Sequence, residues 1–138
     1  ICQQGFDWRL SGSKHGARYG KGSYFAVEAS YSHNYSSKAV QDVCRVFMAK
    51  VIVGSYVAGS YETQRPPSKD SSDPLSPLHD SCVNNVGKPT IFVVFERSQA
   101  YPYYIIDYTN WSPSAAFGEH LKNNILTCRT QCPIHNFE

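Results

Sequence analysis

Two short blocks near the start of the sequence decide how this chain folds: GKGSYFA at residues 20–26 and SYSHNYS at residues 30–36. In the first block, glycines flank an aromatic run, which is the pattern of a short strand bounded by tight turns. The segment from Glu28 to Lys38 has the spacing of a short helix, with Ala29, Ser32 and Ser36 toward one side. The sequence therefore predicts a strand that leads directly into a helix.

The rest of the pattern favours β-structure. Val43 to Val57 is dense in Val, Ile, Phe and Tyr, and predicts one long strand covered on both faces. Thr90 to Glu96 and Ala100 to Tyr108 predict two more strands, and the three residues between them suit an antiparallel hairpin. Five prolines among serines and aspartates make Ser60 to Pro89 a long surface loop. We expect an α+β fold with mostly antiparallel sheets and short helices.

Composition indicates one compact domain without a membrane span. Of the 138 residues, 41% are hydrophobic, and the longest strictly apolar run is Ile91 to Phe95. A spanning helix needs about 18 to 20 such residues. No segment has the pattern of a secretion signal, and the five cysteines form an odd count without regular spacing. We expect reduced thiols, no contact with a membrane, and a location in the nucleus, the cytoplasm or both.

Charge is informative only locally. The formal net charge of +2 predicts no general attraction to nucleic acid or membrane. Between Ile1 and Lys21, however, four Lys or Arg residues and His15 accompany the single acid Asp7. This stretch suits a phosphate group as a ligand, and a solvated surface loop explains it as well.

Three side chains in the opening blocks suit a flat ligand. Ser32 and Tyr35 are three residues apart, so a helix presents both to the same small volume, which Tyr24 can close from the strand. Two aromatic rings and a hydroxyl offer stacking faces and a hydrogen bond to a heteroaromatic amide such as nicotinamide. The alternative is ordinary core packing, because the chain has 10 tyrosines.

The stretch from Tyr19 to Ser36 closely resembles the signature of the catalytic domain of poly(ADP-ribose) polymerases (PARPs). Five further blocks continue the match in order: GFDWR at 5–9, FMAKV at 47–51, DSCV at 80–83, PTIFVVF at 89–95 and YPYYII at 101–106. The resemblance covers residues 1–110. It points to the mono-transferring branch that includes the dioxin-inducible and CCCH zinc-finger members, and implies the C-terminal part of an ADP-ribosyltransferase fold.

This resemblance implies roles for five residues. Tyr24 matches the tyrosine of the family's His-Tyr-Glu triad, Ser32 the serine that binds the nicotinamide carboxamide, and Tyr35 the ring stacked on nicotinamide. Phe25 and Ala26 would line the same pocket. NAD is then the co-substrate, and acceptor proteins are the partners. Nucleic acid would be bound only through domains upstream of this chain, if at all.

The loop from Ser11 to Arg18 matches the family's donor loop over the dinucleotide, which favours the phosphate interpretation of its charge. The third triad position falls on Ile105, the second catalytic position besides Tyr24. A glutamate there holds a ribose hydroxyl and orients an incoming ADP-ribose, whereas an alkyl side chain does neither. The resemblance therefore implies mono-ADP-ribosylation rather than polymer growth. Simple strand packing also explains Ile105.

The triad histidine of the family is expected before Ile1, so we expect the 138 residues alone to have weak NAD affinity and little activity. His15 falls in the donor-loop match, and His33 is expected to face away from Ser32 and Tyr35. A catalytically inactive, PARP-like binding domain is the alternative function. The upstream residue at the triad position, histidine or another, would separate the two.

Residues 111–138 form a divergent tail beyond the match. Glu119 to Leu126 predict a short helix. Three residues in the tail, with His120 as a fourth, have side chains that ligate zinc: Cys128, Cys132 and His135. Their spacing is not that of a recognised zinc site, so we expect no metal.

Overall fold

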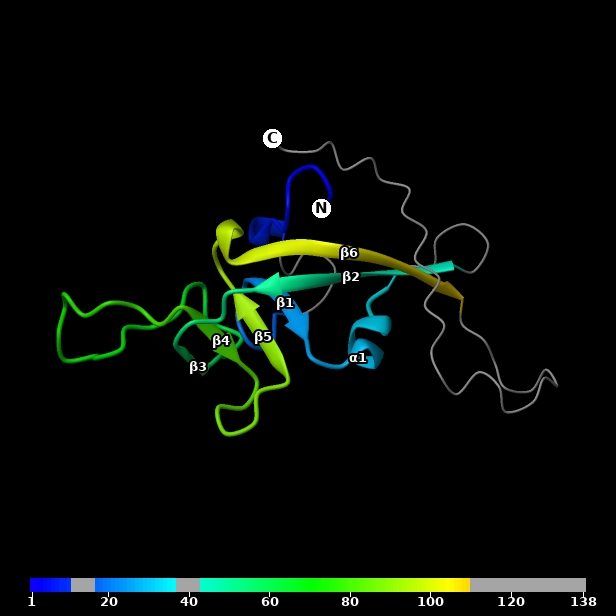
Figure 1. Ribbon diagram of the computed structural model, residues 1–138. Helices are drawn as coiled ribbons and strands as arrows, with labels where there is room; N and C mark the ends of the chain where they lie inside the picture. The colour runs from blue at the N-terminus through cyan, green and yellow to red at the C-terminus, as the bar shows by residue number, and fades with distance from the viewer. Residues whose placement is uncertain (11–16, 37–42, 110–138) are drawn as a thin grey trace.

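The computed structural model describes residues 1–10, 17–36 and 43–109. Its larger sheet has four strands in the order β1-β5-β4-β3. Their bounds are β1 Ser23–Ala26, β3 Tyr56–Ala58, β4 Ser81–Val83 and β5 Ile91–Val94. All neighbours are antiparallel except β3 and β4. The α+β class with mostly antiparallel sheets is confirmed (Figure 1).

The core lies along one row of this sheet. Tyr24 is opposite Val93, which is opposite Cys82, which is opposite Val57. Cys82 and Val93 are fully buried, and Phe95 packs on them together with Tyr24. Because side chains alternate along a strand, the neighbouring row that contains Phe25 points to the other face. The two faces therefore receive Tyr24 and Phe25 separately.

The smaller sheet consists of β2, Val43–Val51, and β6, Ala100–Thr109, paired antiparallel. The register shifts between Met48 and Ala49. Phe6 joins this sheet to the larger one, since its ring lies edge-on to Phe25 at 4.9 Å and to Phe47 at 6.2 Å between centroids. The helix α1, Ala29–His33, contacts β1 and β2 (Figure 1).

The prediction of one strand from Val43 to Val57 is wrong. β2 ends at Val51, and β3 belongs to the other sheet. The chain turns at Gly54, whose φ of +60° favours glycine, and a Cβ there would lie 2.5 Å from Asp80 Oδ2. Asp80 fixes the turn because its carboxylate accepts hydrogen bonds from the Ser55 amide and hydroxyl. β2 is also not covered on both faces, since Met48 is 53% exposed.

The predicted hairpin is also wrong. β5 pairs with β1 and β4, whereas β6 pairs with β2, so the two strands belong to different sheets. The residues between them form a 3-10 turn, Arg97–Gln99, with a capping box between Glu96 and Gln99. The Gln99 amide also donates to the carbonyls of Ile52 and Asp80. These contacts turn the chain from one sheet into the other.

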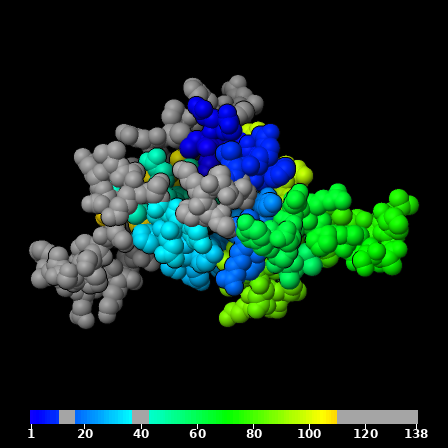
Figure 2. Space-filling view, turned by 180° about the vertical axis from the view of Figure 1, so that it is seen from behind, coloured from blue at the N-terminus to red at the C-terminus, as the bar shows by residue number. Residues whose placement is uncertain are grey.

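The segment from Ser60 to Pro89 is only partly the surface loop that its prolines predict. It contains β4, in which all three residues are buried. A three-residue strand is too short to show periodicity, and its burial comes from pairing with β3 and β5. The residues before it project from the body of the molecule (Figures 1 and 2, green), and Leu75 there is 92% exposed.

The helix predicted from Glu28 to Lys38 is shorter in the structure, because α1 ends at His33. Several further expectations lie outside the described residues: those for His15 and most of the donor loop, for the helix from Glu119 to Leu126, and for the whole tail at 111–138. Among the residues that are described, no helix is long and apolar enough to cross a membrane.

Candidate functional site

The connection from β1 to α1 is held in place by close packing at both of its ends. Before β1, Gly22 has no room for a side chain, because a Cβ would lie 2.5 Å from the Val94 carbonyl oxygen. After β1, the amide of Val27 donates to the carbonyl of Thr90 at 3.0 Å, which keeps the chain beside β5. The helix then begins at Ala29 without a side-chain cap. Glycine packing before β1 and one main-chain bond after it therefore hold this part of the chain beside β5.

The Tyr24 hydroxyl is fixed by the main chain. It accepts a hydrogen bond from the Tyr19 amide at 2.8 Å and donates one to the Gly20 carbonyl at 2.8 Å. Partial burial raises the pKa of Tyr24 above its ordinary value. Tyr24 is therefore a neutral phenol at physiological pH, with its ring against the core and its hydroxyl at a defined position.

A second pair of tyrosines lies at the C-terminal end of α1, with Tyr31 on the helix and Tyr35 in the turn after it. The hydroxyls of Tyr31 and Tyr35 share a hydrogen bond of 3.2 Å, and the ring centroids are 5.4 Å apart. This bond, together with burial, raises the pKa of Tyr31 to about 12. Tyr31 also lies close enough to Tyr19 and Tyr24 for their charges to raise its pKa. We call Tyr19, Tyr24, Tyr31 and Tyr35 the tyrosine cluster.

Sequence analysis identified two members of this cluster and missed Tyr19 and Tyr31. The spacing of four residues between Tyr31 and Tyr35 was the available signal for one of them, because residues four apart meet on a helix. No comparable signal exists for Tyr19. It enters the cluster only because the chain returns past Gly20 into β1.

Ser32 is half-buried on α1, three residues before Tyr35. Its carbonyl accepts a hydrogen bond from the Tyr35 amide at 3.0 Å. Within the described part of the chain its hydroxyl has no hydrogen-bond partner. A half-buried hydroxyl with unused bonding capacity can bind a polar ligand. The prediction that one helix carries both residues is wrong, because α1 ends at His33 and Tyr35 lies in the turn that follows; the main-chain bond nevertheless keeps Tyr35 next to Ser32.

Phe25 and Ile105 lie elsewhere. The Phe25 ring packs edge-on against Phe6, on the sheet face opposite Tyr24. Ile105 is directly opposite Phe47 in the register of β2 and β6, and Phe47 contacts the same Phe6 ring. Ala26 follows the alternation of β1 and shares the Tyr24 face. The structure thus groups Phe25 with the apolar contacts between the sheets, and Ala26 with the tyrosine cluster.

His33 faces away from Ser32 and Tyr35, as expected. Its Nδ1 atom lies 2.7 Å from the Tyr108 hydroxyl, and the two rings are 5.7 Å apart. Because Tyr108 belongs to β6, this contact ties α1 to the smaller sheet. It helps to fix the orientation of α1, which carries Ser32 and leads into the turn with Tyr35.

The basic stretch at the start of the chain is partly neutralised. Arg9 forms a two-pronged hydrogen bond with Asp7, at 2.8 and 2.7 Å. That guanidinium lowers the pKa of Asp7 to about 2. Arg18 lies over the Tyr19 ring, with its guanidinium carbon 5.6 Å from the ring centroid, and so adjoins the tyrosine cluster. Arg18 therefore brings a positive charge to the candidate site.

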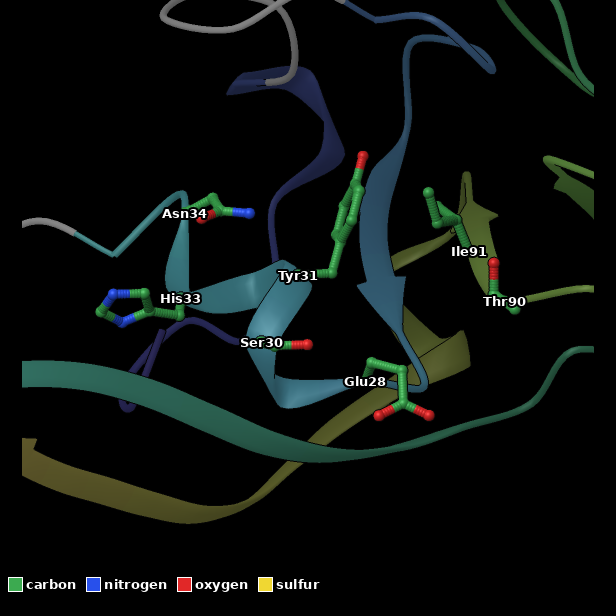
Figure 3. A pocket seen from close by; sticks show the side chains of 7 residues that line it. All are labelled: Glu28, Ser30, Tyr31, His33, Asn34, Thr90 and Ile91. Carbon is green, nitrogen blue, oxygen red and sulfur yellow. The ribbon is translucent and has the colours of Figure 1, made fainter. Parts of the chain in front are cut away.

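A cavity of about 600 Å³ adjoins α1 (Figure 3). Glu28 and four helix residues line one wall: Ser30, Tyr31, His33 and Asn34. Thr90 and Ile91, at the start of β5, line the other. Among the described residues, no group of three or more His, Cys, Asp or Glu side chains could hold a metal ion.

Comparisons with known proteins place these features in a family. The family model described as the poly(ADP-ribose) polymerase catalytic domain matches residues 1–110. Human protein mono-ADP-ribosyltransferase PARP12 is 51% identical over 112 residues, which are 81% of this chain and 15% of that protein. Human protein mono-ADP-ribosyltransferase PARP11 is 39% identical over 127 residues, covering 78% and 37%. The chain thus spans well under half of either relative.

The fold comparison agrees. The crystal structure of the PARP domain of Arabidopsis RADICAL-INDUCED CELL DEATH1 matches with a TM-score of 0.56. Sequence identity is 14%, and the match covers 71% of this chain and 55% of that one. At this identity the likeness concerns the fold. It confirms the predicted architecture of an ADP-ribosyltransferase fold of which this chain is a part.

Proposed function

Because the chain belongs to the family of poly(ADP-ribose) polymerase catalytic domains, we propose that it forms the nicotinamide-binding part of a mono-ADP-ribosyltransferase. The enzyme transfers one ADP-ribose from NAD to an acceptor, a protein side chain, and releases nicotinamide. The chain spans 15% of human PARP12, so this activity belongs to a longer protein. We also propose that this protein acts in the nucleus, the cytoplasm or both.

One observation carries the proposal. Tyr35 is 51% exposed, yet its hydroxyl is bonded to Tyr31 at 3.2 Å. An aromatic ring that is both exposed and oriented is a stacking platform for a flat ligand. Nicotinamide stacked on Tyr35 has the Ser32 hydroxyl, three residues earlier on α1, to bind its carboxamide. Tyr24 bounds the site from β1, which gives the cluster the contacts that a heteroaromatic amide needs.

These residues act by position and charge. Cleavage of the bond between nicotinamide and ribose develops positive charge on the sugar, and a site accelerates it by holding the reactants in line. Tyr35 and Ser32 fix the leaving nicotinamide. Tyr24 is held by the Tyr19 amide and the Gly20 carbonyl, so its ring and hydroxyl stay in one orientation. Each of these contacts lowers the entropy that is lost on reaching the transition state.

Ile105 supports transfer of a single unit. Its alkyl side chain cannot hold a ribose hydroxyl or orient a second ADP-ribose. Its strand neighbour across the sheet is Phe47, so its surroundings are apolar. The site therefore offers no carboxylate at residue 105 that could orient the end of a growing polymer for the next transfer.

Ligand binding tests the pocket without requiring activity. Nicotinamide and benzamide are titrated into the 138-residue chain, with amide chemical shifts as the readout. Tyr35→Ala and Ser32→Leu should each weaken binding by about 1–3 kcal/mol, through lost stacking and an unpaired amide. The matched control is Tyr61→Ala, at a tyrosine that is 61% exposed. Equal affinities in all four proteins would overturn the pocket assignment.

Activity is tested in the parent protein that carries this chain within a complete catalytic domain. Incubation with labelled NAD should add single ADP-ribose units to protein. Ile105→Glu alone is not expected to produce polymer, since chain growth needs further contacts. Long chains from the unmodified protein would refute mono-transfer. Nicotinamide binding without any release of nicotinamide from NAD would support the inactive binding domain instead.

A further inference from the structure

We propose that the cavity between α1 and the start of β5 binds a basic polypeptide segment, with a Lys or Arg side chain directed at Glu28. The cavity measures about 600 Å³, which accommodates one long side chain and its neighbouring backbone. Neither Ser32 nor Tyr35 lines it. It is therefore distinct from the nicotinamide site, and nothing in the proposed transfer reaction yet uses it.

The charged side chain that lines the cavity favours a cationic ligand. Glu28 is its one acidic residue, and the lining contains no Lys or Arg. Within the described part of the chain, the Glu28 carboxylate forms no ion pair. An unpaired carboxylate repels phosphate groups, which argues against nucleic acid and against the pyrophosphate of NAD as the occupant. A positively charged side chain meets no such repulsion.

The walls suit an amphipathic side chain. Figure 3 shows the Tyr31 ring directed along β1, Glu28 in the connection between β1 and α1, and Thr90 and Ile91 on the far side of β1. Lys and Arg pack their hydrocarbon stems on apolar surface and keep the charged end in a polar environment. The Tyr31 ring and Ile91 provide that surface, and Glu28 receives the charge. Ser30 and Asn34 offer hydrogen bonds to the backbone of a bound segment.

The location fits the segment that receives ADP-ribose. Tyr31 lines the cavity, and its hydroxyl is bonded to Tyr35, the proposed stacking platform. A polypeptide in the cavity would therefore lie one side chain away from the nicotinamide site. The identification of this segment as the acceptor rests on the proposed function, whereas binding of a basic segment does not.

Fluorescence anisotropy with labelled peptides tests the proposal on the 138-residue chain. One peptide carries two Arg residues, and its partner has norleucine in their place. The basic peptide should bind about three- to fivefold more tightly, the range of an exposed charge pair, and this preference should shrink as salt is added. Glu28→Gln should remove the preference and Glu28→Lys should reverse it. Glu62→Gln is the matched control, because Glu62 is exposed and outside the cavity.

A second variant fills the space directly. Ser30→Trp should weaken binding of both peptides, because the indole occupies the cavity. Any of three results would overturn the proposal. The unmodified chain could bind the two peptides with equal affinity, Glu28→Gln could keep the preference for the basic peptide, or neither peptide could bind. Nicotinamide titrations on the same samples distinguish the two proposals. If Tyr35→Ala loses nicotinamide binding but keeps the preference for the basic peptide, the substitution affects only the nicotinamide site.

Discussion

The hydroxyl groups of Tyr31, on α1, and Tyr35, in the turn that follows α1, lie 3.2 Å apart. The bond joins the two sites considered above, because Tyr35 is the proposed platform for nicotinamide and Tyr31 lines the adjoining cavity. A ring on a five-residue helix would otherwise turn freely about its side-chain bonds. The pair converts two partly exposed rings into one oriented surface.

Removing one hydroxyl of this pair should change the ionisation of the other. The bond to Tyr35 is the main reason that the pKa of Tyr31 is raised to about 12. In Tyr35→Phe, the Tyr31 pKa should therefore fall toward its ordinary value of 10.0. NMR titration of tyrosine rings labelled at the ζ carbon measures this directly. Tyr61→Phe should leave Tyr31 unchanged, and an unchanged Tyr31 pKa in Tyr35→Phe would contradict the pairing.

Gly22→Ala should destabilise the chain. The added Cβ would lie 2.5 Å from the Val94 carbonyl oxygen and 2.6 Å from Val93 Cγ1, so β1 must move away from β5. Overpacking of this kind costs about 1–3 kcal/mol. Urea unfolding measures the loss. Gly87→Ala is the control, because its nearest neighbour atom would be 3.5 Å away, and equal midpoints for the two variants would refute the packing described here.

Gln99→Ala should loosen the turn between the sheets. The side-chain oxygen Oε1 of Gln99 accepts hydrogen bonds from the amides of Phe95 and Glu96, and its side-chain Nε2 donates to the carbonyls of Ile52 and Asp80. Loss of such a set costs about 1–3 kcal/mol in unfolding free energy. Hydrogen exchange should also become faster at Phe95. Gln64→Ala, at an exposed glutamine, should change neither quantity.

The Asp7 carboxyl should stay ionised to unusually low pH. Its hydrogen bonds with Arg9 lower its pKa from 3.8 to about 2. Because the folded-state pKa is depressed, the pair contributes to stability above pH 3.8 and loses that contribution as the pH falls toward 2. Carboxyl carbon shifts between pH 5 and pH 3 should show little titration of Asp7. In Arg9→Gln the same signal should titrate in that window, and identical curves would contradict the ion pair.

The sequence was sufficient for the local features of the site. Glycines around a short aromatic run predict β1, and the three-residue spacing of Ser32 and Tyr35 predicts that the two lie close together, although α1 ends before Tyr35. Both depend on interactions between residues close in the chain. Resemblance in six ordered blocks then predicted the family, which the comparison over residues 1–110 confirms.

The pairing of strands that are distant in the chain could not be predicted from the sequence, for physical reasons. The run from Val43 to Val57 has uniform β propensity, and β2 is separated from β3 by the turn at Gly54, which Asp80 holds through Ser55, 25 residues earlier in the chain. β4 has three residues, which is too short for a periodic signal, and it is buried because it lies between two other strands. Propensity reports what a segment can form, whereas the partner strand is chosen by packing.

The sequence by itself determined the family, the α+β class and the short helix that carries Ser32, because these follow from local spacing and ordered motifs. Only the tertiary structure decided that Tyr19 and Tyr31 complete the cluster and that the Phe25 ring faces away from Tyr24. It also revealed the cavity beside Glu28. These three features arise where distant segments meet, and such meetings are set by packing of the whole chain rather than by any short stretch of it.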